Sequence, residues 1–462
     1  MSVAWDGATD EVVEHLRALI RIPSVNPPDG RPGLAGGRDP RGGETAAARY
    51  CADVLSSAGV EAEVLEAAPG RGSCFGRLPA TVGDPDPPLI LLSHLDVVPV
   101  EAAAWTWDPF AAEVVNGVVW GRGAVDMKQM IAMELAVMSA LAKSGAERSR
   151  DVIFAALADE EAGGAYGALH WVRERPDLFA DGAGRPAAAA LNEVGGYSMT
   201  IAGRRVYTIQ VAEKGVIWTR LHATGTPGHG SMPHADNPTV KLARAATRLA
   251  ERSARPHVVP VVHDFLVALG LNAVVAAAES GDEVATRAAL EASVEDPVLR
   301  RSLDAMLRDT VTPTVLHSGQ KMNVIPGSGD GEVDVRTLPD TDQTAFLEEL
   351  RALVGDEVTV EPVMMMPPVA WPSDAPIVQL MDEALRRADP EATPAPMMIT
   401  PGTDAKALGL LGIPTYGFMP LRLDPETPFL SLFHAHDERL PVSALRFGLP
   451  VLHEVVSRFV SR

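Results

Sequence analysis

The chain has 462 residues, of which 46% are hydrophobic and 22% charged, and its formal net charge is -21. This length is too great for one simple core and predicts two or three domains. The negative charge argues against nucleic acid and anionic membrane surfaces as partners, because both repel acidic proteins. No segment reaches the roughly 18 uninterrupted apolar residues of a membrane helix.

The cysteine content and the N-terminal segment limit the possible metal ligands and the expected cellular location. Cys51 and Cys74 are too few for a disulfide framework or a thiolate zinc site, and we expect two small buried side chains. Any metal ion must then be held by histidines and carboxylates. The N-terminal segment has no basic region followed by an apolar run, so we expect no signal peptide and a cytoplasmic location.

The first 200 residues alternate between predicted helices and strands. Helical spacing of apolar residues covers 8–21, 44–58, 127–144 and 164–175. Strand patterns cover 60–67, 87–100, 151–158 and 187–196. The last three are apolar runs, typical of strands covered on both faces of a parallel sheet. The alternation therefore predicts an open, mostly parallel α/β sheet.

The pattern changes near residue 200. Alternating strands are predicted over 207–225 and 331–339, helices over 238–253 and 341–353, and an added helical segment within 257–313. A helix over 377–388 and a buried strand within 409–420 then resume the first pattern. We predict that 1–200 and 366–462 form one α/β domain with a mixed, mostly parallel sheet, and that 201–365 form a smaller α+β domain inserted into it.

Polar side chains follow three predicted strands. They are His94 and Asp96 after the first, Asp159, Glu160 and Glu161 after the second, and Glu193 after the third. Ligands gather at the carboxyl ends of strands in open α/β sheets, so these residues are candidates for one site. Each is ambiguous alone, because a histidine at a strand end is often structural and an acidic run is often a solvated loop.

Further candidates lie elsewhere in the chain. Asp126 begins the buried helix, where it is either a plain N-cap or a carboxylate that bridges two cations about 3.5–4 Å apart. His434 and His436 in "SLFHAHDERLP" are either ligands or part of a solvated loop. His229 lies among glycines and prolines in "GTPGHGSMPHADNP", a composition typical of an exposed loop.

Taken in order, nine segments resemble those of a known enzyme family. They are "SHLDVVP", "WTWDPFAAEVVNGVVWGRGAVDMK", "LADEEAGG", "LNEVGG", "GTPGHGSMPHADNP", "NVIPG", "VDVRTLP", "PGTDAKAL" and "FHAHDE". The family is that of the dinuclear zinc hydrolases typified by aminoacylase, acetylornithine deacetylase, succinyl-diaminopimelate desuccinylase and carboxypeptidase G. The resemblance implies a catalytic α/β domain with an inserted ferredoxin-like α+β lid that often serves for dimerisation.

The resemblance also implies roles for individual residues. It makes Asp126 the bridging ligand of two zinc ions, with His94 and Glu193 on one ion and Glu161 and His434 on the other. Cobalt or manganese would suit the same donors. The resemblance makes Glu160 the general base and Asp96 the clamp on His94. It makes His229 the lid histidine that polarises the scissile carbonyl from a partner subunit. The contacts of the substrate carboxylate would be Asn323, Arg336 and Gly402.

We therefore expect a hydrolase for the amide bond of an N-acyl amino acid or a small peptide with a free carboxylate, acting as a homodimer. Deacylase and dipeptidase or carboxypeptidase activities compete within that class, and an esterase using the same metals is a weaker rival. A non-catalytic metal-binding relic or regulator is the alternative of another class. Glu193, where many members have Asp, and Lys406, where Arg is frequent, loosen any assignment to one substrate.

Overall fold

The computed structural model describes residues 5–26, 43–201 and 203–461, and these form two compact units. Unit 1 comprises the described residues up to Val211, together with Trp371–Pro396 and Thr403 onward. Unit 2 comprises Ala212–Ala370 and Met397–Gly402. The sequence predicted an insertion over 201–365, and its use as a lid or a dimerisation domain stays a prediction.

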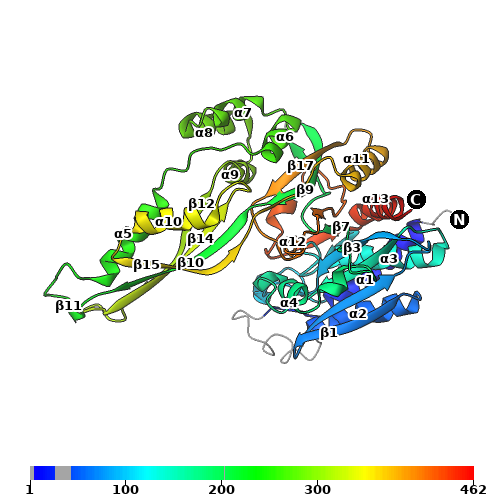
Figure 1. Cartoon of the computed structure of the whole chain (residues 1–462), viewed down its shortest axis with the longest axis horizontal. Coiled ribbons are helices and arrows are strands. Elements are labelled where there is room, and N and C mark those ends of the chain that lie inside the picture. The colour runs from blue at the N-terminus through cyan, green and yellow to red at the C-terminus, as the bar shows by residue number, and fades with distance from the viewer. Residues whose placement is uncertain (1–4, 27–42, 202, 462) are drawn as a thin grey trace. The chain divides into compact units, whose positions relative to one another are not determined.

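Helices and strands alternate along much of unit 1 (Figure 1). Its α-helices are α1 (Trp5–Ile20), α2 (Glu44–Ser57), α3 (Lys128–Ser144), α4 (Ala168–Glu174), α11 (Pro376–Ala388), α12 (Ala405–Gly409) and α13 (Val442–Val460). Short 3-10 helices are η1 (Ala102–Ala104), η2 (Glu160–Ala162), η3 (Pro176–Phe179) and η4 (Phe429–Ser431). The strands are β1 (Glu61–Ala68), β2 (Arg71–Leu78), β3 (Asp86–His94), β4 (Val114–Val115), β5 (Val118–Trp120), β6 (Arg150–Leu157), β7 (Ala189–Asn192), β8 (Ser198–Ile201), β9 (Arg204–Glu213), β17 (Thr393–Ile399), β18 (Thr415–Gly417) and β19 (Arg439–Pro441).

The main sheet of unit 1 is mixed and has a parallel centre. Its strands follow the order β1-β2-β6-β3-β7-β18-β9, and β6, β3, β7 and β18 pair in parallel while β1, β2 and β9 pair antiparallel. Residues 89–92 of β3 are fully buried, as the apolar run predicted. The register pairs His94 with Leu157 and Leu91 with Leu191, so the carboxyl ends of β3, β6 and β7 lie at one edge of the sheet.

Unit 2 contains a four-stranded antiparallel sheet in the order β12-β14-β10-β15. The strands of unit 2 as a whole are β10 (Gly215–Thr224), β11 (Gly228–His229), β12 (Thr310–Ser318), β13 (Val324–Ile325), β14 (Ser328–Thr337), β15 (Val358–Met366) and β16 (Val369–Ala370). Its helices are α5 (Pro238–Ala250), α6 (Pro260–Ala268), α7 (Asn272–Glu279), α8 (Glu283–Ser293), α9 (Pro297–Met306) and α10 (Gln343–Val354). Helices α5 and α10 lie along the sheet and share a core with it (Figure 1). With the added helices α6–α9 and the short strands β11 and β13 set aside, the order β10-α5-β12-β14-α10-β15 confirms the ferredoxin-like α+β prediction.

The predicted helices and strands match observed elements within a few residues, but several elements were not predicted, among them β2, β12, β15, β17 and α13. Strand β2, "RGSCFGRL", carries two glycines and no regular alternation of apolar residues. Strand β12 begins inside the segment that was expected to be helical up to residue 313 and continues beyond it. Helix α13 lies after the last segment that was assigned from its pattern.

Candidate metal centre

Three strand ends in unit 1 deliver the predicted donor residues. His94 is the last residue of β3, Glu193 directly follows β7, and Glu160 and Glu161 follow β6 in the short helix η2. The chain turns sharply after β6 because Asp159 adopts a left-handed conformation with φ of 70°. The strand ends therefore gather the donors as the sequence predicted.

Asp126 lies between two groups of donors. Its Oδ1 is 3.0 Å from Nε2 of His94, which is also 3.8 Å from a carboxylate oxygen of Glu193. Its Oδ2 is 3.2 Å from Nε2 of His434, which is 3.1 Å from a carboxylate oxygen of Glu161. Each oxygen of Asp126 thus faces one histidine and, beyond it, one glutamate. This arrangement is compatible with a carboxylate that bridges two cations.

Two sets of donor atoms lie close enough to hold an ion. His94, Asp126 and Glu161 form one set and His94, Glu160 and Glu193 the other, with the atoms of each set within 4.8 Å of one another. Glu161 Oε1 is buried without a hydrogen-bond partner among the described residues. A buried carboxylate oxygen in a cluster of acids fits a cation when no described residue donates a hydrogen bond to it.

The backbone around Asp126 is held by Glu438, which sequence reasoning did not single out. The buried Glu438 carboxylate accepts hydrogen bonds from the amides of Gly123, Val125 and Asp126 at 3.0, 2.6 and 3.0 Å. Arg122 Nη1 donates to the same carboxylate at 2.7 Å. Glu438 therefore fixes the turn that presents Asp126.

Asp96 holds the site through two kinds of contact. The closest partner of His94 Nδ1 is the main-chain oxygen of Asp96 at 3.0 Å, while the Asp96 carboxylate lies at 3.5 Å. The two carboxylate oxygens accept hydrogen bonds from the amides of Glu160 and Glu161, both at 3.1 Å. Asp96 therefore links the histidine to the acidic turn, which is more than the clamp on His94 that the sequence suggested.

Burial and mutual repulsion make the glutamates of this cluster resist ionisation. Burial, and then the nearby Glu193 charge, raise the pKa of Glu160 well above its ordinary value. Burial and the Asp126 charge raise the pKa of Glu161 to about 7 and that of Glu193 to about 6. Burial opposes the ionisation of Asp126 too, but hydrogen bonds to His434 and His94 lower its pKa.

The neighbouring carboxylates raise the pKa values of the two histidines, His94 and His434. Burial disfavours the charged form of His94, yet Glu193 and the hydrogen bonds to Asp126 and Asp96 raise its pKa well above the ordinary value. Hydrogen bonds to Asp126 and Glu161 raise the pKa of His434 to about 10. The acidic neighbours therefore favour the protonated, positively charged form of both histidines. A bound cation would take the place of these protons. The donor set therefore fits divalent metal ions.

His229 and Asn323 lie together at one end of unit 2. His229 pairs with Val324 in the small β11–β13 sheet, and the amide of Gly230 donates to the main-chain oxygen of Asn323 at 2.9 Å. Both side chains are exposed, and His229 Nδ1 is 2.8 Å from the Ser231 hydroxyl oxygen. The structure therefore brings these two predicted residues together.

Arg336 and Gly402 occupy other parts of unit 2. Arg336 lies near the far end of β14, where its Nε and Nη2 donate to the Asp334 carboxylate at 2.6 and 3.0 Å. Gly402 is partly buried in the loop that follows β17. The Arg336 fork that was predicted to hold a substrate carboxylate thus holds a carboxylate of the same strand.

Asp404 is a further buried acid of unit 1 that sequence reasoning missed. Its Oδ2 has no hydrogen-bond partner among the described residues, and burial raises the pKa of Asp404 well above its ordinary value. Its charge contributes to the raised pKa of Glu160. The "PGTD" segment was noted for Gly402 alone, although Asp404 is the residue of that segment with a side chain suited to the cluster.

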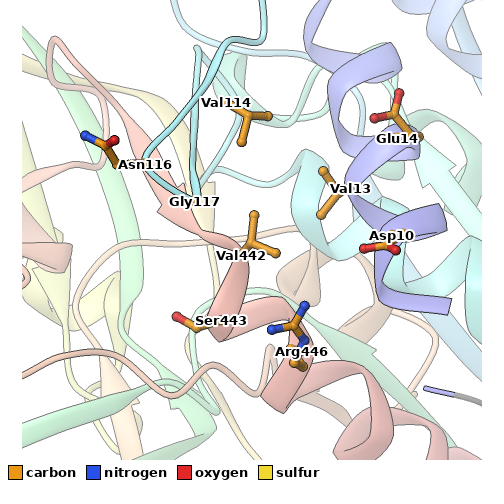
Figure 2. A pocket seen from close by; sticks show the side chains of 9 residues that line it. All are labelled: Asp10, Val13, Glu14, Val114, Asn116, Gly117, Val442, Ser443 and Arg446. Carbon is orange, nitrogen blue, oxygen red and sulfur yellow. The ribbon is translucent and has the colours of Figure 1, made fainter. Parts of the chain in front are cut away.

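A pocket of 620 Å³ lies elsewhere in unit 1, between α1, the β4–β5 turn and the start of α13 (Figure 2). Asp10 and Glu14 of α1 and Arg446 of α13 line it with several small or apolar residues. No histidine and no predicted site residue is among its lining residues. Size alone therefore does not make it the site of chemistry.

An α/β sheet with histidines and carboxylates gathered at its strand ends is typical of the metal-dependent hydrolases. Comparison with known proteins gives the particular family. The sequence model of peptidase family M20/M25/M40 matches residues 90–458. The chain belongs to that family. It is therefore a hydrolase that acts on amide bonds.

Individual relatives agree with this assignment. The chain is 28% identical to aminoacylase-1 of Sus scrofa over 431 residues, which is 90% of each chain. It is 34% identical to a succinyl-diaminopimelate desuccinylase of Methylobacterium radiotolerans over 248 residues, or 52% of this chain and 56% of the relative. An M20 family metallo-carboxypeptidase from Sulfolobus solfataricus shares the fold with a TM-score of 0.72 at 17% identity, covering 97% and 98% of the two chains. Among the described residues, no helix has the length and apolar character needed to cross a membrane.

Proposed function

We propose that this hydrolase cleaves the amide bond of an N-acyl amino acid, or of a small peptide with a free carboxylate, with the help of two divalent cations. One observation carries the proposal: the two oxygens of Asp126 face His94 and His434, 3.0 and 3.2 Å away. Zinc is the first expectation, because imidazole and carboxylate donors without thiolates suit zinc, cobalt or manganese. The similarity to aminoacylase-1 supports the substrate class.

The proposed ligands divide around Asp126. His94 and Glu193 would hold one cation and His434 and Glu161 the other, with Asp126 shared. Two cations bound in this way would lower the pKa of a water molecule between them toward neutrality and polarise the scissile carbonyl. The deep burial of His94, Asp126 and Glu193 keeps bulk water from competing with these contacts.

Glu160 is proposed as the general base. Its carboxylate lies within 4.8 Å of donor atoms of His94 and Glu193. In the proposed division of ligands around Asp126, Glu160 is left free to act on the water. The raised pKa of Glu160 suits a group that takes a proton from the attacking water and then donates it to the leaving amine. Asp96 supports this role by accepting hydrogen bonds from the amides of Glu160 and Glu161.

Residues of unit 2 are proposed to recognise the substrate. Arg336, Asn323 and the main chain at Gly402 would bind its carboxylate, and His229 would donate a hydrogen bond to the developing oxyanion. Binding at Arg336 requires the substrate carboxylate to replace Asp334 or to share the guanidinium with it. Arginine suits this task because its planar fork matches a carboxylate.

The layout of unit 2 supports a homodimer. His229 and Asn323 lie beyond the end of β14 that begins at Ser328, whereas Arg336 lies eight residues along that strand, roughly 27 Å away. A dipeptide spans only about 7 Å. One copy of unit 2 therefore cannot place both sets on one small substrate. We propose that the second copy in a homodimer supplies His229 and Asn323.

The test of the proposed chemistry is the replacement of Glu160 by Gln, with Glu174→Gln at the exposed end of α4 as the matched control. Turnover of Glu160→Gln should fall by about 10²–10⁴-fold while its metal content stays that of the unaltered enzyme. Glu174→Gln should keep both. An active Glu160→Gln enzyme would refute the assigned base, and full activity after complete removal of metal by a chelator would refute the metal mechanism.

A substrate panel separates the remaining alternatives. It contains N-acyl amino acids, dipeptides, the same compounds with amidated carboxyl groups, and matching esters. We expect cleavage of free-carboxylate amides and a strong loss with the amidated forms. Preference among the acyl compounds and the dipeptides decides between deacylase and dipeptidase. Turnover of none of them, with metal bound, would instead support a binding or regulatory protein.

A further inference from the structure

A buried ionic network lies directly behind the acidic turn. Arg71 of β2, Glu44 of α2 and Asp159 after β6 are each at most 3% exposed. Arg71 Nη2 donates to Glu44 Oε1 at 2.9 Å and also to the Asp159 carboxylate, and Arg71 Nε donates to the other Glu44 oxygen. One guanidinium therefore joins two acids that come from distant parts of the chain.

The network fixes the conformation of Asp159 from several sides. The Asp159 amide donates to Glu44 Oε1 at 3.0 Å, and its second carboxylate oxygen accepts from the Tyr166 amide at 2.8 Å. Its main-chain oxygen accepts from the Gly164 amide at 2.7 Å, and the Arg71 guanidinium lies over the Tyr166 ring at 5.4 Å. The whole loop 159–166 is thus fastened to Arg71 and its partners.

This fastening opposes a conformational cost. Asp159 has a φ of 70°, a left-handed conformation that is unfavourable for most residues other than glycine. A chain that relaxed at Asp159 would turn the following residues away from the strand ends. The contacts of Arg71 and Glu44 therefore select the backbone path that brings Glu160 and Glu161 to the donor cluster.

Asn26 extends the network to the other side of the turn. Its Nδ2 donates to Asp96 Oδ2 at 2.6 Å and to Asp159 Oδ1 at 3.3 Å. Asp96 in turn accepts the amides of Glu160 and Glu161. A continuous path of hydrogen bonds thus leads from Arg71 to the backbone of the proposed base and ligand.

We propose that Arg71, through Asp159, is a positioning residue for Glu160 and Glu161, an inference that rests on the proposed function. Arg71 touches neither glutamate in the contacts described above, so it acts through the turn and not on the substrate. Its guanidinium has five donors in a planar fork and can bond two carboxylates at once. A lysine has one nitrogen and cannot reproduce both sets of bonds in the same directions.

The experiment compares Arg71→Lys with Arg77→Lys, which is the same change on the same strand. Arg77 pairs with Asp151 and the Ala180 main-chain oxygen and has no described contact with the 159–166 turn. We expect Arg71→Lys to lower kcat by about 10–100-fold with little change in KM, and to weaken metal binding by a similar factor. Arg77→Lys should leave kcat, KM and metal affinity unchanged. Thermal unfolding of the metal-free proteins shows the folded fraction of each.

A double-mutant cycle distinguishes positioning from a general structural effect. If Arg71 acts through the turn, Arg71→Lys should weaken metal binding much less once Glu161 has been replaced by Ala. An equal loss in both backgrounds would overturn the proposal, as would an Arg71→Lys enzyme with normal kcat and metal affinity. These metal measurements do not depend on the substrate, so they remain decisive even if the proposed reaction fails in the unaltered enzyme.

Asp159 gives a second route if Arg71→Lys does not fold. Asn tolerates the left-handed conformation and keeps an acceptor, whereas Ala keeps neither advantage. We therefore expect a smaller loss of kcat in Asp159→Asn than in Asp159→Ala, with metal affinity following the same order. Equal kcat and equal metal affinity in the two folded variants would contradict the proposed role of the turn.

Discussion

The donor cluster of unit 1 and the polar residues of unit 2 differ in how far the chain itself fixes them. His94, Asp126 and Glu193 are buried, and the backbone that carries Asp126 is fixed by Glu438. His229 and Asn323 of unit 2 are exposed, and Arg336 is paired with Asp334. The first group is arranged before any ligand binds, whereas the second has partners that a ligand must replace or join.

This difference indicates which unit is expected to carry the chemistry and which the substrate recognition. Preorganised groups in a site of low dielectric constant contribute to catalysis because little reorganisation is needed during the reaction. Exposed groups on a separate compact unit gain their full effect only when a substrate or a second chain joins them. Changes in unit 1 should therefore act on metal binding and kcat, and changes in unit 2 on KM or on subunit complementation.

The largest effect is expected from Asp126→Asn, with Asp86→Asn at the exposed start of β3 as control. Asn keeps the size of the side chain but removes the charge that both cations would share. Metal affinity should fall by more than about 100-fold, since partners that merely orient ligands are worth about 10–100-fold. Chelator competition measures the affinity of each variant. An Asp126→Asn protein that binds two ions normally would contradict the shared-ligand arrangement.

The second expected effect is recovery of activity in mixtures of two inactive variants. Glu160→Gln lacks the base and His229→Ala lacks the proposed donor, so each homodimer should be inactive. Random exchange of subunits should restore about a quarter of the normal activity, because half the dimers are mixed and each holds one intact site. His222→Ala, another exposed histidine of unit 2, should be active alone. Failure to recover activity after verified exchange would show that His229 does not act across a dimer.

The third effect concerns Arg336. Arg336→Ala should raise KM by about 10–100-fold for substrates with a free carboxylate, since a hydrogen bond to a charged group contributes about 1.5–3 kcal/mol. It should have little effect with amidated substrates. Arg220→Ala, at an exposed site of β10, is the matched control. A loss confined to kcat, or equal losses for both kinds of substrate, would place Arg336 outside carboxylate recognition.

The smallest effect is a pair of opposite pH dependences of stability. Burial raises the pKa of Glu134 in unit 1 from its ordinary value of 4.5 to about 8, and it lowers the pKa of Lys214 in unit 2 from its ordinary value of 10.5 to about 7. The folded protein therefore keeps the Glu134 proton longer than the unfolded chain does, and stability falls as pH rises from about 4.5 to 8. It loses the Lys214 proton earlier, so stability rises between about 7 and 10.5.

Denaturant unfolding between pH 5 and pH 10 tests this contrast. Relative to the unaltered protein, Glu134→Gln should gain stability with rising pH in the lower window, by at most about 1.4 kcal/mol per pH unit. Lys214→Met should lose relative stability with rising pH in the upper window. The same sign for both variants would contradict the assigned burial effects.

The sequence predicted much of the donor cluster because parallel strands bring their carboxyl ends to one edge. His94, Glu160 and Glu193 follow strands whose apolar runs are plain in the sequence, so their proximity could be expected. The assignment of separate roles to Glu160 and Glu161 came from the family resemblance. Strand geometry alone does not distinguish two adjacent acids in a turn.

The supporting contacts could not be predicted in the same way. Glu44 and Arg71 lie 115 and 88 residues from Asp159, and β2, which carries Arg71, shows no regular alternation. Glu438 stands in a recognised segment, yet nothing in its pattern shows that its carboxylate accepts three backbone amides. Only the pairing of Arg336 with Asp334 follows a simple rule, since residues two apart on a strand point to the same face.

The central claim is that two cations share Asp126, and anomalous diffraction from crystals grown with zinc tests it most directly. The account predicts two anomalous peaks per chain, about 3.5–4 Å apart, with Asp126 between them, His94 and Glu193 on one peak and His434 and Glu161 on the other. A single peak, or peaks that do not contact Asp126, would contradict it.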